Sequence, residues 1–190
     1  MNYELFCIFA HKFQITTMNR LQQAFVWLWR IGHCRGFGIQ SPTDYRFVRY
    51  VINEHWPYYA YEELGRNCNW YSRKMGQLYF RLANERQPRT IIDKIGFRKY
   101  LQAGCRKAQF VDDAEEIELA IMPNCIIDYD SLFGKCNDRS IVVIHNICAA
   151  PKFWRVIKRH PKVTVTFDLY YCGIVLFDSK RAKQNYIINF

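Results

Sequence analysis

Residues 90–97, Thr-Ile-Ile-Asp-Lys-Ile-Gly-Phe, mark the point at which a helical sequence changes to alternating strands and helices. The three isoleucines predict a buried first strand over residues 91–95, which turns at Gly96. A strand–turn–helix junction that holds a nucleotide-like ligand usually contains several glycines, because the backbone must approach the ligand closely. This stretch contains a single glycine, and it therefore indicates the fold better than it indicates an activity.

The length and composition predict one domain with a substantial core. The chain has 190 residues, of which 50% are hydrophobic and 17% aromatic. No run reaches the roughly 18 apolar residues that a membrane-spanning helix requires. The apolar patch at residues 5–10 is short and lacks a small-residue cleavage site, so no secretory signal is expected. We therefore expect a soluble, cytoplasmic protein with no membrane association.

Neither the cysteines nor the charge defines a specific ligand. The eight cysteines include no pair at the two-residue spacing of zinc or redox motifs, and several lie in apolar runs. They predict scattered, mostly buried free thiols rather than a disulfide framework or a metal site. The net charge of +10, from 27 basic and 17 acidic side chains, favours acidic partners in general.

Residues 18–87 predict a helical prefix to a single domain that covers residues 18–190. Residues 1–17 show no clean periodicity, and we expect a poorly ordered N-terminal extension there. Ser41, Pro42 and Asp44 provide an N-cap, a proline at the first helical position and an acid three residues after the cap, which together predict a helix start. The expected helices cover residues 19–31, residues 42 onward to an end at Pro57, residues 58–64 and residues 72–85.

Apolar residues recur at helical spacing along the three longer helices and predict one apolar face for each. These residues are Leu21, Phe25, Leu28 and Trp29 in the first helix, Tyr45, Val48, Val51 and Ile52 in the second, and Met75, Leu78, Tyr79 and Leu82 in the last.

After Pro88 the pattern alternates between strands and helices, which predicts a mostly parallel sheet with crossover helices. The expected strands cover residues 91–95, 108–111, 117–122, 140–144, 162–168 and 173–177, and the expected helices cover residues 98–104, 128–133 and 151–159. The last two strands lie close enough in sequence to pair as an antiparallel hairpin. Residues 186–190 are a candidate edge strand.

This order of elements resembles that of class I S-adenosylmethionine-dependent methyltransferases, and more specifically a methyltransferase-like family of Bacteroidetes. The segments that carry the resemblance are residues 36–42 (GFGIQSP) with 59–63 (YAYEE), residues 74–82 (KMGQLYFRL) with 88–92 (PRTII), and residues 138–144 (DRSIVVI) with 160–166 (HPKVTVT) and 173–177 (GIVLF). The resemblance covers both ends of the chain and is weaker in the middle. It implies a Rossmann-like methyltransferase-type sheet whose last strand inserts antiparallel beside the fifth.

The resemblance also implies where S-adenosylmethionine would bind. In relatives an acidic residue and a glycine-rich loop follow the first strand, and a carboxylate after the second strand accepts hydrogen bonds from the ribose hydroxyls. The matching positions are Asp93, Gly96 and Asp112, which we assign as the candidate cofactor-binding residues. Another interpretation is that Asp112 and its acidic neighbours, Asp113, Glu115 and Glu116, cap and solvate the next turn.

Several departures from the family pattern weaken the expected activity. The turn at Gly96 carries three cations, Lys94, Arg98 and Lys99, although the cofactor is itself a sulfonium cation. The short link between residues 111 and 117 implies that the third-strand region is deleted. Residues 121–124 (IMPN) replace an acidic turn, and His145-Asn146 replaces paired aspartates, which argues against metal-assisted transfer.

The first hypothesis is therefore a degenerate methyltransferase-like protein with weak or absent cofactor binding and no catalytic residue. In this hypothesis S-adenosylmethionine binds only if the ancestral site survives. An alternative is an active, divergent methyltransferase for a small-molecule acceptor, with His145 as the general base. The structural interpretation of His145 is that it simply ends a buried strand.

A second alternative is a basic nucleic-acid-binding module built on residues 151–162. This segment has aromatic side chains between its cations, a combination that nucleic-acid surfaces use for stacking and phosphate contacts. The residues are Lys152, Phe153, Trp154, Arg155, Lys158, Arg159 and Lys162. We prefer the interpretation in which the aromatic residues pack on the sheet and the cations face water, and we do not expect nucleic acid as a partner.

Overall fold

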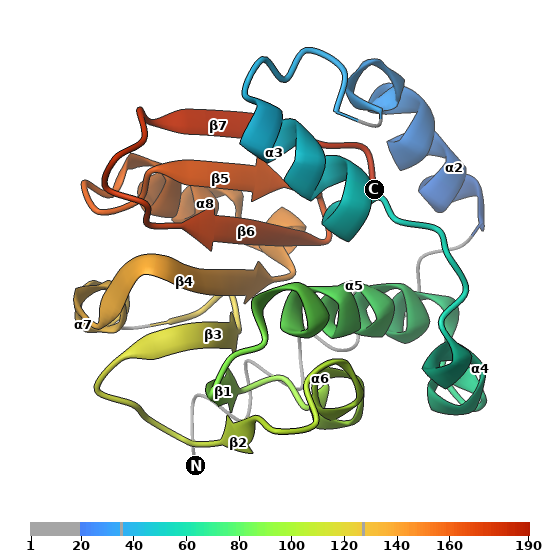
Figure 1. Ribbon diagram of the computed structural model, residues 1–190. Helices are drawn as coiled ribbons and strands as arrows, with labels where there is room; N and C mark the ends of the chain where they lie inside the picture. The colour runs from blue at the N-terminus through green and yellow to red at the C-terminus, as the bar shows by residue number, and fades with distance from the viewer. Residues whose placement is uncertain (1–19, 35, 127) are drawn as a thin grey trace.

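The computed structural model describes residues 20–34, 36–126 and 128–190, and shows an α/β fold around one seven-stranded sheet (Figure 1). The predicted N-terminal extension at residues 1–17 lies outside the described residues. The strands are β1 (Thr90–Asp93), β2 (Gln109–Phe110), β3 (Ile117–Met122), β4 (Cys136–His145), β5 (Val165–Asp168), β6 (Cys172–Leu176) and β7 (Gln184–Ile187). The α-helices are α2 (Arg20–Trp29), α3 (Pro42–Phe47), α4 (Tyr59–Gly65), α5 (Trp70–Arg86), α6 (Arg98–Gly104), α7 (Tyr129–Gly134) and α8 (Pro151–Arg159).

Shorter turns connect these elements. A π-helical turn, η2 (Val48–Ile52), continues α3, and the 3₁₀ turns η1 (Ile31–His33) and η3 (Ile147–Ala149) follow α2 and β4. Within the described part of the chain, no helix has the length and apolar character needed to cross a bilayer.

The sheet has the strand order β2-β1-β3-β4-β6-β5-β7. Strands β1 to β4 pair in parallel, and β6 is antiparallel to both of its neighbours, β4 and β5. The predicted mostly parallel sheet and antiparallel hairpin are confirmed. The last strand, β7, begins two residues before the predicted segment at 186–190 and pairs in parallel with β5. In the described chain β2 is an edge strand, and only residues 111–116 separate it from β3.

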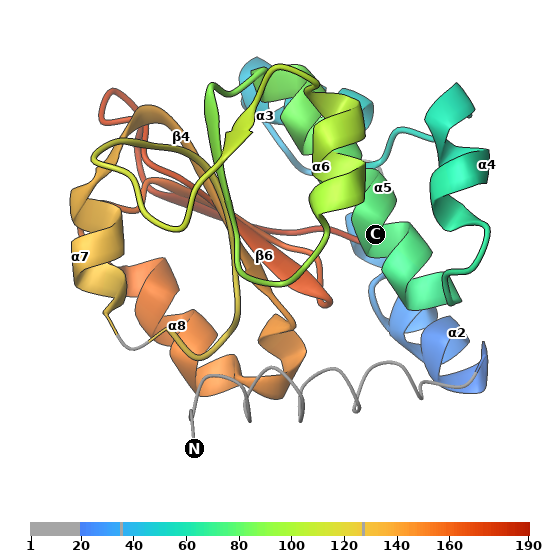
Figure 2. The same cartoon turned by 90° about the horizontal axis from the view of Figure 1, so that it is seen from below.

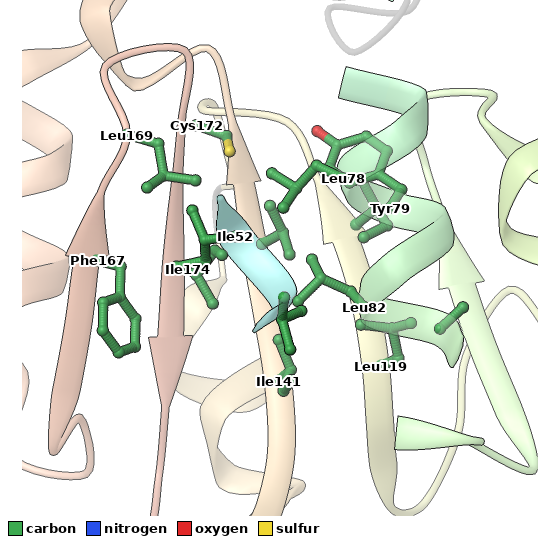
Figure 3. Close-up of a cluster of buried hydrophobic side chains, with 14 of the residues drawn as sticks. Ile52, Leu78, Tyr79, Leu82, Leu119, Ile141, Phe167, Leu169, Cys172 and Ile174 are labelled. Carbon is green, nitrogen blue, oxygen red and sulfur yellow. The ribbon is translucent and has the colours of Figure 1, made fainter. Parts of the chain in front are cut away.

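Helices cover both faces of the sheet, with α5 and α6 on one face and α7 and α8 on the other (Figure 2). Strand β4 contributes to both cores, because Ile141 and Val143 join the first cluster while Val142 and Ile144 join the second. Figure 3 shows the first cluster, to which Leu78 and Leu82 of α5 and Ile141 of β4 belong. All of these side chains are buried, so the sheet is a central layer with apolar contacts on each side.

The helical prefix follows the predicted pattern in part, and its second helical segment ends at Ile52, earlier than the predicted end at Pro57. The Ser41 side chain accepts a hydrogen bond from the Asp44 amide, which confirms the predicted N-cap. Three residues of the apolar face predicted for the second helix are buried, namely Val48, Val51 and Ile52. The prediction was wrong for Tyr45, which is 45% exposed because its ring lies over Gly36 instead of the sheet.

Helix α2 also differs from the expectation. The predicted apolar face is present, but its four residues, Leu21, Phe25, Leu28 and Trp29, are exposed. The helix is held by its opposite side, where Val26 is buried and Arg30 forms an ion pair with Asp168 (Nη2–Oδ1 2.5 Å). Arg30 also donates to the carbonyl oxygens of Asp168 and Ile188.

The described cysteines are all free thiols, as predicted, and Cys7 lies outside the described residues. Cys105 and Cys172 are buried, whereas the other five are only half-buried. The expectation of mostly buried thiols was therefore too strong.

Replacement of Gly173 by alanine is expected to destabilise the fold. A Cβ at this position would overlap the six-membered ring of Trp154. That ring cannot move freely, because Trp154 is buried and its Nε1 donates to Asp168 Oδ2 at 2.9 Å. We expect Gly173→Ala to lower the free energy of unfolding by about 1–3 kcal/mol, measured by urea denaturation.

Gly134→Ala is the matched control, because Gly134 has no atom within 4 Å of an added Cβ. It should change the free energy of unfolding by less than about 0.5 kcal/mol. Equal effects of the two substitutions would contradict the predicted role of the Trp154 contact.

Candidate functional site

The carboxyl ends of six described strands lie along one edge of the sheet. Strands β1 to β4 are parallel, β5 runs in the same direction because both β4 and β5 are antiparallel to β6, and β7 is parallel to β5. In open α/β sheets this edge is where ligands bind. The polar residues at or just after the strand ends are Asp93, Asp112, Asn124, His145 and Asp168.

The turn after β1 is stabilised by the carboxylate of Asp93. Its Oδ1 accepts hydrogen bonds from the amides of Ile95 (3.0 Å) and Gly96 (2.9 Å), so the strand ends at Asp93, two residues earlier than predicted. Gly96 has φ +91°, a backbone conformation that residues with a side chain rarely adopt. No described atom lies within 4 Å of a Cβ added at this position. Gly96 is thus needed for the backbone angle of the turn and not for close packing within the chain.

Asp112 lies near this turn and is paired with a cation from it. Lys94 Nζ is 3.1 Å from Asp112 Oδ1, and the two side chains are exposed. The three predicted cofactor-binding residues therefore lie in one region, with Lys94 joining the turn of Asp93 and Gly96 to Asp112. Such an exposed ion pair contributes at most about 1 kcal/mol to stability, so it affects the local charge more than the fold.

Asp113, the next residue, supports the capping interpretation of this acidic segment. Its side chain accepts a hydrogen bond from the Ala114 amide and contacts Lys135 Nζ at 2.6 and 2.7 Å. The hydrogen bond from Lys135 is the main reason that the pKa of this carboxyl lies below its usual range.

His145, at the end of β4, is hydrogen-bonded through both ring nitrogens. Nε2 lies 3.0 Å from the hydroxyl of Tyr71, and Nδ1 lies 2.6 Å from the hydroxyl of Tyr79. Burial raises the pKa of both tyrosines, so each hydroxyl keeps its proton at neutral pH. One tyrosine can donate to the unprotonated ring nitrogen while the other accepts from the N–H, an arrangement that orients the imidazole.

Asn124, which follows β3, is a buried residue that sequence reasoning did not assign to the site. Its Nδ2 donates to the carbonyl oxygen of Asn146 at 2.7 Å, whereas its Oδ1 is buried and has no hydrogen-bond partner among the described residues. A buried acceptor without a partner is costly, and Oδ1 is therefore a group to which a ligand could donate.

Tyr71 and Tyr79 were also missed as polar residues of this edge, because helical spacing identified Tyr79 only as part of an apolar face. The signal was their separation by eight residues, which places both on the same side of α5. Such spacing makes a shared partner possible, but it does not reveal that the partner is His145, 74 and 66 residues away in sequence.

Lys74 lies on the same helix and has an unusual environment for a lysine. Its Nζ lies 4.0 Å from the ring centroid of Phe190 and 5.5 Å from that of Trp70. Among the described residues it forms no ion pair. Burial lowers the pKa of this amine to about 8.

The predicted packing of α8 is confirmed. Trp154 and Ile157 are buried against the sheet, while Lys152, Arg155 and Arg159 are exposed. These three cations form no ion pair with the described residues.

Over the described ranges, His, Cys, Asp and Glu side chains do not gather in a group of three that could hold a metal ion. Comparison of the chain with protein-family models, with curated proteins and with solved structures found no match.

Removal of the Tyr79 hydroxyl should destabilise the protein, because it takes away the hydrogen bond between this buried side chain and Nδ1 of His145. We expect Tyr79→Phe to lower the free energy of unfolding by about 1–3 kcal/mol in urea denaturation. Tyr59→Phe is the control, since the Tyr59 side chain is fully exposed. An unchanged stability of Tyr79→Phe would show that this hydrogen bond does not hold His145.

Lys74→Met should stabilise the protein in a pH-dependent way. The amine has a pKa of about 8 in the folded chain and an ordinary value of 10.5, so below pH 8 it is protonated in both states and the folded state bears the full cost of burying the charge. Between pH 8 and 10.5 the unfolded chain binds more protons, and the stability of the wild type rises with pH.

The gain in unfolding free energy from Lys74→Met should therefore be about 1–2 kcal/mol at pH 7 and should shrink as the pH approaches 10.5. Urea denaturation at pH 7, 9 and 10.5 measures this change. Lys99→Met, at an exposed position, provides the control and should show no such trend. A gain that stays constant with pH would reject the effect of Lys74 burial.

Proposed function

We propose that this protein is a degenerate relative of class I S-adenosylmethionine-dependent methyltransferases that retains the fold and does not catalyse methyl transfer. Two features of the sheet support this proposal. Strand β6 lies antiparallel between β4 and β5, which is the arrangement that the sequence resemblance implies. The short connection from β2 to β3 fits a sheet that has lost its third-strand region.

The observation that carries the proposal is the pairing of Lys94 with Asp112 at 3.1 Å. Asp112 is the carboxylate that would accept hydrogen bonds from the cofactor ribose, and in this protein it faces a cation. S-adenosylmethionine carries a positive sulfonium, so Lys94 also opposes its binding electrostatically. Asp93 Oδ1 already accepts two amide hydrogen bonds from its own turn. These residues do not fit the cofactor well.

His145, the side chain that would supply a general base, is already hydrogen-bonded within the fold. Both ring nitrogens of His145 lie within hydrogen-bond distance of α5 tyrosines. A base must be able to reach the proton of an acceptor, and here each nitrogen already has a neighbour within the protein. We therefore assign His145 a structural role and derive no catalytic step from it.

One observation favours the alternative of an active, divergent methyltransferase for a small molecule. The buried Oδ1 of Asn124 lies at the carboxyl edge of the sheet, and the part of the chain that the structure describes provides no hydrogen-bond partner for it. A ligand that donates a hydrogen bond there would complete the site. This alternative requires binding of the cofactor, and the same experiment tests both.

Isothermal titration calorimetry with S-adenosylmethionine and S-adenosylhomocysteine tests the proposal. We expect dissociation constants of about 1 mM or weaker, equivalent to no more than about 4 kcal/mol of binding free energy. S-adenosylhomocysteine, which lacks the sulfonium charge, should bind no more weakly than S-adenosylmethionine. Lys94→Ala should selectively improve the binding of S-adenosylmethionine.

Asp112→Ala and Glu115→Ala form a matched pair for this titration, since both acids are exposed in the same segment. Micromolar binding by the wild type that is lost in Asp112→Ala and kept in Glu115→Ala would overturn the proposal. Methyl transfer to any acceptor that is lost in His145→Ala would establish the alternative.

A further inference from the structure

The outward side of α2 and the following turn is the most apolar exposed surface formed by one segment of the described chain. Its six large apolar side chains are between 49% and 81% exposed. They are Leu21 (81%), Phe25 (70%), Trp27 (49%), Leu28 (58%), Trp29 (71%) and Ile31 (53%). We refer to these six residues as the α2 face.

The α2 face is exposed because of how the helix is attached. Val26 is buried and Arg30 pairs with Asp168, so the side that carries these two residues is turned toward the protein. Figures 1 and 2 both show α2 at the periphery of the molecule, away from the centre of the sheet. The attachment thus fixes the helix with its apolar side outward.

The area of the α2 face is large for the surface of a monomer. Fully buried aromatic side chains contribute 150–250 Å² each, so three aromatic and three aliphatic residues at the observed exposures present on the order of 700 Å². Soluble monomers seldom expose a continuous apolar patch larger than a few hundred Å². A standard protein–protein interface buries about 800 Å² on each partner. The α2 face is therefore close to one partner's share of an interface.

The spacing of the side chains favours a helix as the occupant. Leu21, Phe25 and Leu28 of α2 follow one another at intervals of four and three residues, which is the spacing of a helix–helix seam. A second helix of the same spacing could pack its side chains between those of α2.

The charge distribution favours a second copy of the same chain. Arg20 is the only charged residue in α2, although the whole chain carries a net charge of +10. Two identical surfaces related by a two-fold axis meet like with like, so a charged patch would repel its copy whereas this apolar face would not. An acidic partner or an anionic lipid surface would instead be attracted to cations such as Lys152, Arg155 and Arg159 of α8.

We propose that two copies of this chain associate through their α2 faces, with the α2 helices packed against each other across a two-fold axis. The burial of Leu21, Phe25 and Leu28 from both copies provides the apolar contact. This inference does not depend on cofactor binding or on the absence of catalysis.

Sedimentation velocity of the full chain over about 1–100 μM, in 150 mM salt to screen the net charge, tests the proposal. We expect a monomer–dimer equilibrium within this range. Phe25→Asp/Leu28→Asp should remain monomeric at the highest concentration, because two charges would face two charges in the dimer. Both positions are exposed, so the circular dichroism spectrum of the variant should equal that of the wild type.

Trp56→Asp is the matched control, because Trp56 is 75% exposed but belongs to the segment before α4. It should dimerise as the wild type does. Hydrogen exchange gives a second measurement, in which protection of the amides of residues 21–31 should increase with protein concentration in the wild type and not in the double variant.

A wild type that stays monomeric at 100 μM would overturn the proposal, whether residues 1–19, another protein or a lipid surface covers the α2 face. Dimers that persist in Phe25→Asp/Leu28→Asp would also overturn it, since they would use another surface. Binding of the monomer to phosphatidylcholine–phosphatidylglycerol vesicles, lost in the double variant, would identify a lipid surface as the occupant instead.

Discussion

The carboxylate of Asp168 is the contact on which the arrangement of the outer elements depends. It pairs with Arg30 of the segment after α2, accepts from Trp154 Nε1 of α8 and accepts from the Tyr170 amide in the β5–β6 turn. Elements far apart in sequence are thus attached to the end of one strand. Because the Arg30 and Asp168 side chains are largely buried, loss of either partner would leave an uncompensated charge, which makes the pairing specific. The same contact turns the apolar side of α2 outward.

Much of the core could be predicted from sequence because apolar patterning sets the position of each element. Ile141 to Ile144 is a continuous apolar run, as expected of a strand buried on both faces, and β3, α6 and α8 have the predicted bounds. The orientation of α2 could not be predicted, because it depends on Arg30 meeting a carboxylate 138 residues away. When most of a helix surface is apolar, the apolar residues alone do not determine which side faces the core. In this protein the ion pair between Arg30 and Asp168 determines it.

The candidate site was predictable only in part, for a similar reason. The resemblance assigned Asp93, Gly96 and Asp112 to the turns after the first two predicted strands. In the structure Asp93 and Gly96 share one turn, and Lys94 of that turn pairs with Asp112. The partners of these residues could not be predicted, because hydrogen bonds and ion pairs depend on side-chain positions that periodicity does not fix. The two tyrosines around His145 come from a helix whose spacing indicated only a core face. The apolar pattern of the sequence therefore locates the carboxyl edge of the sheet, whereas the chemistry of that edge depends on tertiary contacts.

The contacts at this edge have a consequence for how the protein could have evolved. Active sites usually contain polar groups whose hydrogen bonds are completed only by a ligand, and this costs stability. Here the polar groups of Asp93, Asp112 and His145 have partners within the chain, so their hydrogen bonds and charges are largely matched without a ligand. Asn124 is the exception, with a buried side-chain oxygen that finds no hydrogen-bond partner within residues 20–34, 36–126 and 128–190. An edge whose hydrogen bonds are largely made within the chain gains less from a bound ligand, which is the physical argument behind the proposed loss of cofactor binding.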